Sequence, residues 1–101
     1  MGDRPDRFLP LFIADYLADT AHLTRDQHGA YLLLLMAYWR RGGPLPDNDA
    51  KLANIVRASH HEWKKLRPVM LDFFTADGTD FRNKRSDHEL ERAEARSQAK
   101  A

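Results

Sequence analysis

The stretch Asp15–Trp39, DYLADTAHLTRDQHGAYLLLLMAYW, together with the RRGGPLPDND that follows it, decides the fold of this chain. Thr24 and Gln27 have the spacing of a capping box, in which the hydroxyl accepts the backbone N–H three residues on and the amide reaches back. Every residue of Ala30–Trp39 is apolar or aromatic, so the helix should be apolar on all sides and lie in the middle of the fold. The Gly-Gly-Pro that follows ends a helix. We therefore predict a central helix over Arg25–Arg41.

The composition indicates one small globular domain. The chain has 101 residues, of which 43% are hydrophobic and 10% aromatic. It contains no cysteine, which excludes disulfides, thiol catalysis and thiolate metal sites. The longest apolar run is about half of the ~20 residues needed to cross a bilayer. The N-terminal MGDRPDRF does not have the form of a signal peptide. We expect a soluble, cytoplasmic protein.

The net charge of +1 gives no overall electrostatic argument for nucleic acid, but the charge is unevenly distributed. Residues 57–85 carry seven Lys or Arg against four acidic residues, a net charge of +3, and the remainder carries nine against eleven, a net charge of −2. Positive charge is therefore concentrated in the second half of the chain. An excess of this size more often belongs to an ordinary solvated surface than to a binding face.

The segments around the central helix predict further short elements. Phe8–Ile13 is apolar and is interpreted as an edge strand or a hydrophobic anchor that leads into a short helical turn. Asp47 is the expected N-cap of a second helix that ends near Arg57. Ser59 and Glu62 form another capping box, so a third helix should begin almost at once, which makes a tight helix–turn–helix joint.

The third helix leads into a hairpin. Its apolar residues recur at helical spacing and form one stripe, Trp63, Leu66, Met70 and Phe73. Pro68 should kink this helix or end its first half. The Asp-Gly pair at 77–78 stands between two β-prone runs and predicts a β-hairpin, because the tight turn requires positive φ.

A last helix is predicted from Ser86, which forms a capping box with Glu89. Leu90 is its only large apolar residue, so most of this helix should be solvated. The complete order predicts a mainly α fold with a small β-hairpin, a winged helix-turn-helix. We assign residues 1–85 to the winged-helix domain and residues 86–101 to a solvated helix that begins a tail or linker.

These segments resemble the YdaU-like family, a prophage-associated group without settled function. The resemblance covers roughly residues 8–92 and rests on DYLADTAHLT, HGAYLLLLMAYWRRGGPLP, AKLANIV, EWKKLRPVMLDFF and RSDHEL. It implies similarity to the N-terminal winged-helix domains of phage replication initiators and replisome organisers.

The order of elements and the resemblance together predict DNA binding. In a helix-turn-helix the second helix lies in the major groove, and the early residues of that helix meet base edges. Lysine and arginine neutralise phosphates and release counterions. The residues expected to face DNA are Arg57, His60, His61, Lys64, Lys65 and Arg67 on the joint and third helix, and Arg82, Lys84 and Arg85 on and after the hairpin. The alternative interpretation is that these are ordinary solvated charges.

Several conspicuous residues are better interpreted as core than as site. Trp63 could stack on single-stranded nucleic acid, but it shares the apolar stripe of the third helix. Tyr31, Tyr38 and Trp39 lie in the most apolar helix of the chain and need only partners for their polar groups. Gly29 is interpreted as a close-packing position.

Asp15, Asp19, His22 and His28 form the only cluster that resembles a metal or acid–base site. Carboxylates and imidazoles are ligands for zinc or manganese. Their spacing is poor for one helix face, however, and local side-chain bonding explains the same residue types. There is no phosphate loop, Gly-x-Ser-x-Gly or HExxH. We expect neither an enzyme nor a cofactor.

The alternative function is a protein–protein docking or oligomerisation module of a replication assembly, without contact to DNA. The near-neutral charge favours it, and the partners would be a replication protein or a second copy in a homodimer. A contiguous positive patch on the third helix and the hairpin would favour DNA. Interruption of that patch by Asp72, Asp77 and Asp80 would favour a protein partner.

Overall fold

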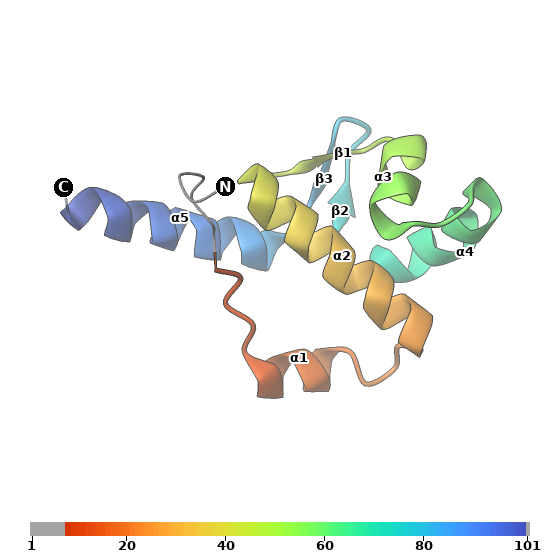
Figure 1. Cartoon of the computed structure of the whole chain (residues 1–101), viewed down its shortest axis with the longest axis horizontal. Coiled ribbons are helices and arrows are strands. Elements are labelled where there is room, and N and C mark those ends of the chain that lie inside the picture. The colour runs from red at the N-terminus through yellow and green to blue at the C-terminus, as the bar shows by residue number, and fades with distance from the viewer. Residues whose placement is uncertain (1–7, 101) are drawn as a thin grey trace, which may run out of the picture.

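The computed structural model of this chain describes residues 8–100, with side chains up to residue 96. The elements are α1 (Ile13–Asp19), α2 (Arg25–Arg41), β1 (Leu45–Pro46), α3 (Asp49–Val56), α4 (His60–Met70), β2 (Thr75–Ala76), β3 (Asp80–Arg82) and α5 (Lys84–Lys100). In Figure 1, α2 runs through the middle of the molecule, with α1 below it and the sheet, α3 and α4 on the other side. The described part is therefore mainly helical with one small sheet, as predicted. The predicted domain ranges also include residues 1–7 and 101, which lie outside the described residues.

Helix α2 has the predicted limits. The Thr24 hydroxyl accepts from the Gln27 backbone N–H at 3.2 Å, and the Gln27 amide oxygen accepts from the Thr24 N–H at 2.9 Å. Gly42 ends the helix with a φ of 84°. Helix α2 is not buried on all sides as predicted, however, because Met36 is 52% exposed. One stripe of α2 therefore faces solvent.

The core confirms the interpretation of the large aromatic residues. Trp63, Tyr38 and Phe81 are fully buried, Trp39 is buried, and Tyr31 is half-buried against the same cluster. The Trp39 indole N–H donates to the Ser86 hydroxyl at 3.1 Å, and the Trp63 indole N–H donates to Asp49 at 2.9 Å. The polar atoms of both indoles are thus satisfied inside the protein.

Helix α3 begins one residue later than predicted. Asn48, not Asp47, is the N-cap, and its side chain accepts from the Lys51 N–H at 3.0 Å. The Asp47 carboxylate instead bonds Arg67 at 2.9 Å and the Gly78 N–H at 2.8 Å. The prediction was wrong because these long-range partners compete for Asp47 and the neighbouring asparagine can cap equally well.

Helix α4 begins at the predicted capping box, with the Ser59 hydroxyl accepting from the Glu62 N–H at 3.1 Å. Pro68 does not end the helix, which continues to Met70. Trp63 and Met70 are both completely buried on one side of α4, so packing holds the last turn despite the hydrogen bond lost at the proline.

The predicted hairpin is present, but it belongs to a three-stranded antiparallel sheet of order β1-β3-β2. Phe81 pairs with Ala76 on one side and with Leu45 on the other, and Gly78 adopts a φ of 89° at the tip. No strand was predicted at Leu45–Pro46. A strand of two residues has no periodicity to detect, and it is formed by pairing with β3.

Helix α5 begins before the predicted capping box of Ser86 and Glu89. Asn83 precedes the helix, and its side chain accepts from the Ser86 N–H at 2.8 Å. Ser86 is buried and bonds Trp39, and Asp87 accepts from the Tyr38 hydroxyl. The proposed box is therefore wrong, because packing against α2 occupies Ser86. The predicted boundary between residues 85 and 86 falls inside α5.

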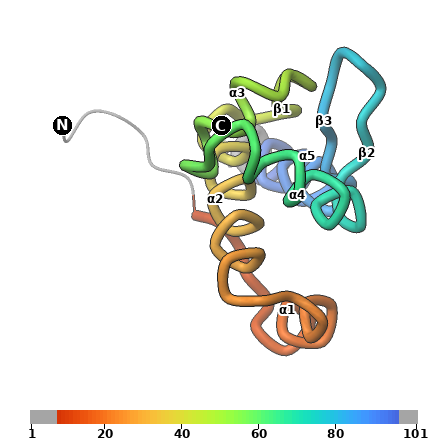
Figure 2. Tube along the Cα trace, turned by 90° about the vertical axis from the view of Figure 1, so that its right-hand side faces the viewer, coloured from red at the N-terminus to blue at the C-terminus, as the bar shows by residue number. Residues whose placement is uncertain are grey.

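In the described N-terminal segment, the regular element is the helix α1. Residues 8–12 form no strand in the described structure, and α1 has no buried residue. Tyr16 stacks on Tyr31 with centroids 5.8 Å apart, and the buried Thr20 hydroxyl donates to the Tyr16 carbonyl at 2.6 Å. In Figure 2, α1 and the β2–β3 hairpin lie at opposite ends of the molecule.

Gly29 is exposed on α2, and a Cβ added there would meet nothing within 4 Å. The interpretation of Gly29 as a close-packing position is therefore wrong within this chain. A glycine inside a helix is unfavourable relative to alanine, because it loses more backbone freedom on folding.

We predict that Gly29→Ala raises the free energy of unfolding by about 0.5–1 kcal/mol, measured by urea denaturation. Gly78→Ala is the matched control, since it also meets nothing within 4 Å but has a φ of +89°. It should lower the stability by about 1 kcal/mol or more. Destabilisation by Gly29→Ala would contradict the assignment of open space around this residue.

Candidate nucleic-acid interface

The exposed face of α4 carries most of the predicted contact residues. His60, His61, Lys64 and Lys65 are all exposed. The last three follow His60 by one, four and five residues, which places all four on one side of the helix. The opposite side is fixed by the buried Trp63 and Met70. The structure thus gathers four basic or titratable side chains on a single solvent-facing surface.

The turn before α4 contains only Arg57, Ala58 and Ser59. Arg57 is the C-cap of α3 and has a φ of 60°, a left-handed conformation that usually favours glycine. The Ala58 N–H donates to the Ala53 carbonyl at 2.9 Å, which closes the end of α3. Arg57 is exposed and lies three residues before the start of α4.

Arg67 is turned toward the protein. Its Nη1 lies 2.9 Å from an Asp47 oxygen and 3.0 Å from an Asp49 oxygen, and its guanidinium lies 5.6 Å from the centroid of the Phe81 ring. The hydrogen bond that Arg67 donates to Asp47, together with the negative charges of Asp47 and Asp49, raises the pKa of Arg67 above its ordinary value. This side chain connects α4 with the start of α3 and with the sheet, which favours a positioning role over contact with a ligand.

The hairpin is less basic than its sequence suggested. Arg82 pairs with Asp87 at 3.0 Å and with Asp80 at 3.5 Å. At the tip, the Asp77 carboxylate accepts the N–H groups of Asp80 and Thr79 at 2.6 and 2.8 Å. These backbone bonds lower the pKa of Asp77 and keep it ionised. Acidic residues therefore interrupt the positive charge here.

The two basic residues that follow the hairpin lie on α5. Lys84 is exposed in the first turn. Arg85 bonds Asp15 at 3.1 Å, lies 3.8 Å from Asp19, and places its guanidinium 5.3 Å from the centroid of the Phe12 ring. Arg85 therefore links α5 to the N-terminal segment and α1, and it does not extend the surface of α4.

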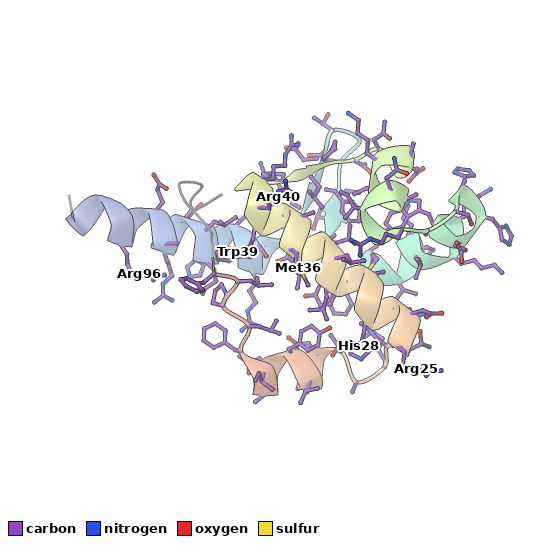
Figure 3. All side chains as sticks on the ribbon, in the orientation of Figure 1. Arg25, His28, Met36, Trp39, Arg40 and Arg96 are labelled. Carbon is purple, nitrogen blue, oxygen red and sulfur yellow. The ribbon has the colours of Figure 1, made fainter. Side chains whose placement is uncertain are left out.

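A groove beside α4 contains a basic residue that was not among the predicted DNA contacts. Arg25, at the start of α2, lines this groove together with Arg57 and Lys65. The lining also includes the acidic Asp26 and Glu62 and the apolar Ala30 and Leu66. Figure 3 shows Arg25 at the end of α2. No local pattern identifies Arg25, because only the packing of α2 against α4 brings the two segments together.

The four metal candidates do not converge. His28 Nδ1 lies 3.0 Å from the Tyr16 hydroxyl, and His22 Nε2 lies 3.3 Å from an Asp72 oxygen. Asp15 and Asp19 face Arg85 instead. The part of the chain that the structure describes contains no group of three or more histidine, cysteine or acidic residues able to hold a metal. It also contains no helix long and apolar enough to span a membrane.

Comparison with known proteins identifies the family. A family model described as "Protein of unknown function (DUF1376)" matches residues 7–91. The chain belongs to the DUF1376 family. A relative, "Uncharacterized protein YdaU" from Escherichia coli (strain K12), is 42% identical over 83 residues, which cover 82% of this chain and 28% of that protein. The predicted YdaU-like family is thus confirmed, and the chain spans less than a third of this relative. No solved structure matches the chain.

Two substitutions of Arg57 separate the effect of its backbone strain on stability from the effect of its charge on ligand binding. Arg57→Gly should raise the free energy of unfolding by roughly 0.5–1 kcal/mol relative to Arg57→Ala, because glycine adopts the left-handed conformation without a steric penalty. Both variants remove the same guanidinium, so any loss of ligand binding through that group should be equal in the two. Urea denaturation provides the comparison, and equal stability of the two variants would refute the strain at this position.

Asp49 should make stability depend on pH. The hydrogen bond from the Trp63 indole, followed by the charge and hydrogen bond of Arg67, lowers the pKa of Asp49 below its ordinary value. A lowered folded-state pKa gives stability that is present above the unfolded-state pKa of about 4 and is lost as the pH falls through the folded-state pKa.

We expect Asp49→Asn to lose less stability than the wild type when the pH is lowered from 6 to 3, measured by denaturant unfolding. Trp63→Phe removes the first cause of the pKa shift, so it should also flatten the pH profile, although its stability will be lower throughout. Profiles parallel to that of the wild type would show that Asp49 does not contribute.

Proposed function

We propose that this chain is a winged helix-turn-helix domain that binds double-stranded DNA through α4. The order α2-β1-α3-α4-β2-β3 supports this fold, as does the joint of three residues between α3 and α4. Helix-turn-helix motifs use such short turns and place their second helix in the major groove.

One observation carries the proposal: the side of α4 opposite its buried face presents His60, His61, Lys64 and Lys65 to solvent. A helix anchored along one side by a buried tryptophan can enter a groove with its other side. Lysines there would neutralise phosphates, and the histidines at the N-terminal end are placed where helix-turn-helix proteins contact base edges.

The distribution of ion pairs modifies the predicted contact set. Arg25 and Arg57 flank the α4 surface and are the best candidates for further phosphate contacts. Arg67, Arg82 and Arg85 are held by carboxylates, so we assign them to positioning, and Lys84 is a peripheral contact at most. We infer that the protein binds DNA in the cytoplasm and has no catalytic activity. The resemblance to phage replication initiators supports a role in replication initiation or its regulation.

The test is fluorescence anisotropy of the 101-residue chain with labelled random duplex and single-stranded DNA, at low and at physiological salt. Lys64→Glu with Lys65→Glu should abolish binding to duplex. If Arg25, Arg57, Lys64 and Lys65 each neutralise one phosphate, the logarithm of the binding constant should fall with the logarithm of salt concentration with a slope of about −3 to −4.

The matched control is Lys51→Glu with Arg96→Glu, which changes the net charge equally at two exposed positions on α3 and α5. Figure 3 places Arg96 far along α5 from the α4 surface. This control should retain binding. Equal loss in both variants would indicate a nonspecific charge effect, and retention in both would exclude the α4 surface.

A second candidate function is docking of a replication protein without contact to DNA. It is favoured by the carboxylates at the hairpin tip and by the three arginines already paired with acidic residues. Absence of duplex binding even at low salt would favour this function.

A further inference from the structure

Helix α1 turns an uncharged face to solvent. Ile13 and Leu17 are 68% and 60% exposed, and Ala14 and Ala18 are also exposed. At 3.6 residues per turn these four positions cover an arc of about 140° without a polar side chain. In a surface helix the apolar stripe normally faces the core, whereas in α1 the apolar Ile13 and Leu17 are about as exposed as the side chains of Asp15 and Asp19, at 66% and 63%.

Specific contacts hold α1 in this orientation. On its inner side, the Tyr16 hydroxyl lies 3.0 Å from His28 Nδ1, and the Tyr16 ring stacks on Tyr31. Arg85 binds Asp15 and Asp19 at the flank of the helix. The polar residues of α1 are thus satisfied within the chain, and the apolar side remains facing outward. Among the described residues 8–100, Figure 1 shows no helix or strand beyond α1 on its outer side.

The exposed apolar surface extends onto the segment before α1. Among the described residues, five of the seven exposed large hydrophobic side chains lie within ten positions, Phe8, Leu11, Phe12, Ile13 and Leu17. These five side chains lie on α1 and on the segment that leads into it, and exposed apolar side chains gathered in this way mark an interaction site.

We propose that this surface, residues 8–18, is the interface through which two copies of the chain associate. A phenylalanine side chain alone accounts for roughly 150–250 Å² when fully buried. Phe8 and Phe12 are 91% and 50% exposed and the three aliphatic side chains are 40–68% exposed, so together they offer several hundred Å² per chain, less than the ~800 Å² that each partner buries in a standard interface. The uncharged face of α1 requires an equally uncharged partner surface, and a second copy supplies one.

The pattern of side chains on α1 is self-complementary. Ile13 and Leu17 form a ridge along i and i+4, and Ala14 and Ala18 form the shallow row beside it. Around a two-fold axis with the helices antiparallel, the ridge of each copy packs into the alanine row of the other. Ala14 and Leu17 lie nearest the axis in this arrangement. The inference does not depend on DNA binding.

Cysteine cross-linking tests the arrangement directly, because the chain contains no native cysteine. Ala14→Cys should form an intermolecular disulfide under mild oxidation, since the Cα atoms of the two copies would lie within the ~7 Å that a disulfide can bridge. Ala95→Cys is the matched control, an equally small change at an exposed alanine of α5. Cross-linking that is no faster for Ala14→Cys than for the control overturns the interface.

Sedimentation equilibrium of the full chain, from low micromolar to submillimolar concentration, gives the second readout. The wild type should approach twice the 11.7 kDa of one chain. Leu17→Lys should raise the dissociation constant at least tenfold, because it places an ammonium group without a counter-charge in the interface. Met36→Lys, at a 52% exposed position on α2, should leave it unchanged. A monomer at every concentration overturns the proposal, even if the same face then binds lipid vesicles or another protein.

Discussion

The ion pairs of Arg67 with Asp47 and Asp49 constrain the arrangement of α3, α4 and the sheet. The guanidinium lies 2.9 and 3.0 Å from the two carboxylates, and the second oxygen of Asp47 accepts the Gly78 N–H at the hairpin tip. The Asp47 side chain is only 8% exposed and that of Arg67 26%. Removal of one partner would therefore leave a poorly solvated charge, which costs more than the pair itself contributes. This contact adds to the burial of Trp63 and Met70, which leaves the opposite side of α4 facing solvent.

The same constraint divides the basic residues into two groups. Arg67, Arg82 and Arg85 form ion pairs between elements, a role suited to the planar guanidinium with its several donors. Lys64 and Lys65 remain at the surface of α4 as flexible point charges, which suits phosphate contact without fixed geometry. Positive residues counted in sequence thus overstate the charge available to a ligand, since the pairing with carboxylates is a tertiary property.

The molecule presents two surfaces of opposite character. The outer side of α4 is polar and basic, whereas α1 and the segment before it are apolar and carry their charged residues at the flank. Figures 1 and 2 place α1 at the end of the molecule away from the hairpin. A partner on α1 would leave the sheet and the hairpin uncovered.

Features that depend only on residues close together in the chain could be predicted from the sequence. The capping boxes at Thr24 and Ser59, the glycine stop at Gly42 and the Asp-Gly hairpin are confirmed, because a few consecutive side chains satisfy the same backbone groups in any context. Membership of the YdaU-like family also followed from the sequence.

Other features depend on the tertiary structure, because in these a residue can bond either a neighbour in sequence or a distant partner. Asp47 was expected to cap α3 but binds Arg67, and Ser86 was expected to cap α5 but bonds Trp39. The strand β1 forms by pairing with β3. The candidate site was predictable for His60, His61, Lys64 and Lys65 because helical spacing fixes their common face. Arg25 could not be placed there from sequence, since its proximity to Lys65 arises from the packing of α2 against α4. Local backbone bonding is encoded within a few residues, whereas the partner of a long charged side chain is chosen only when the chain has folded.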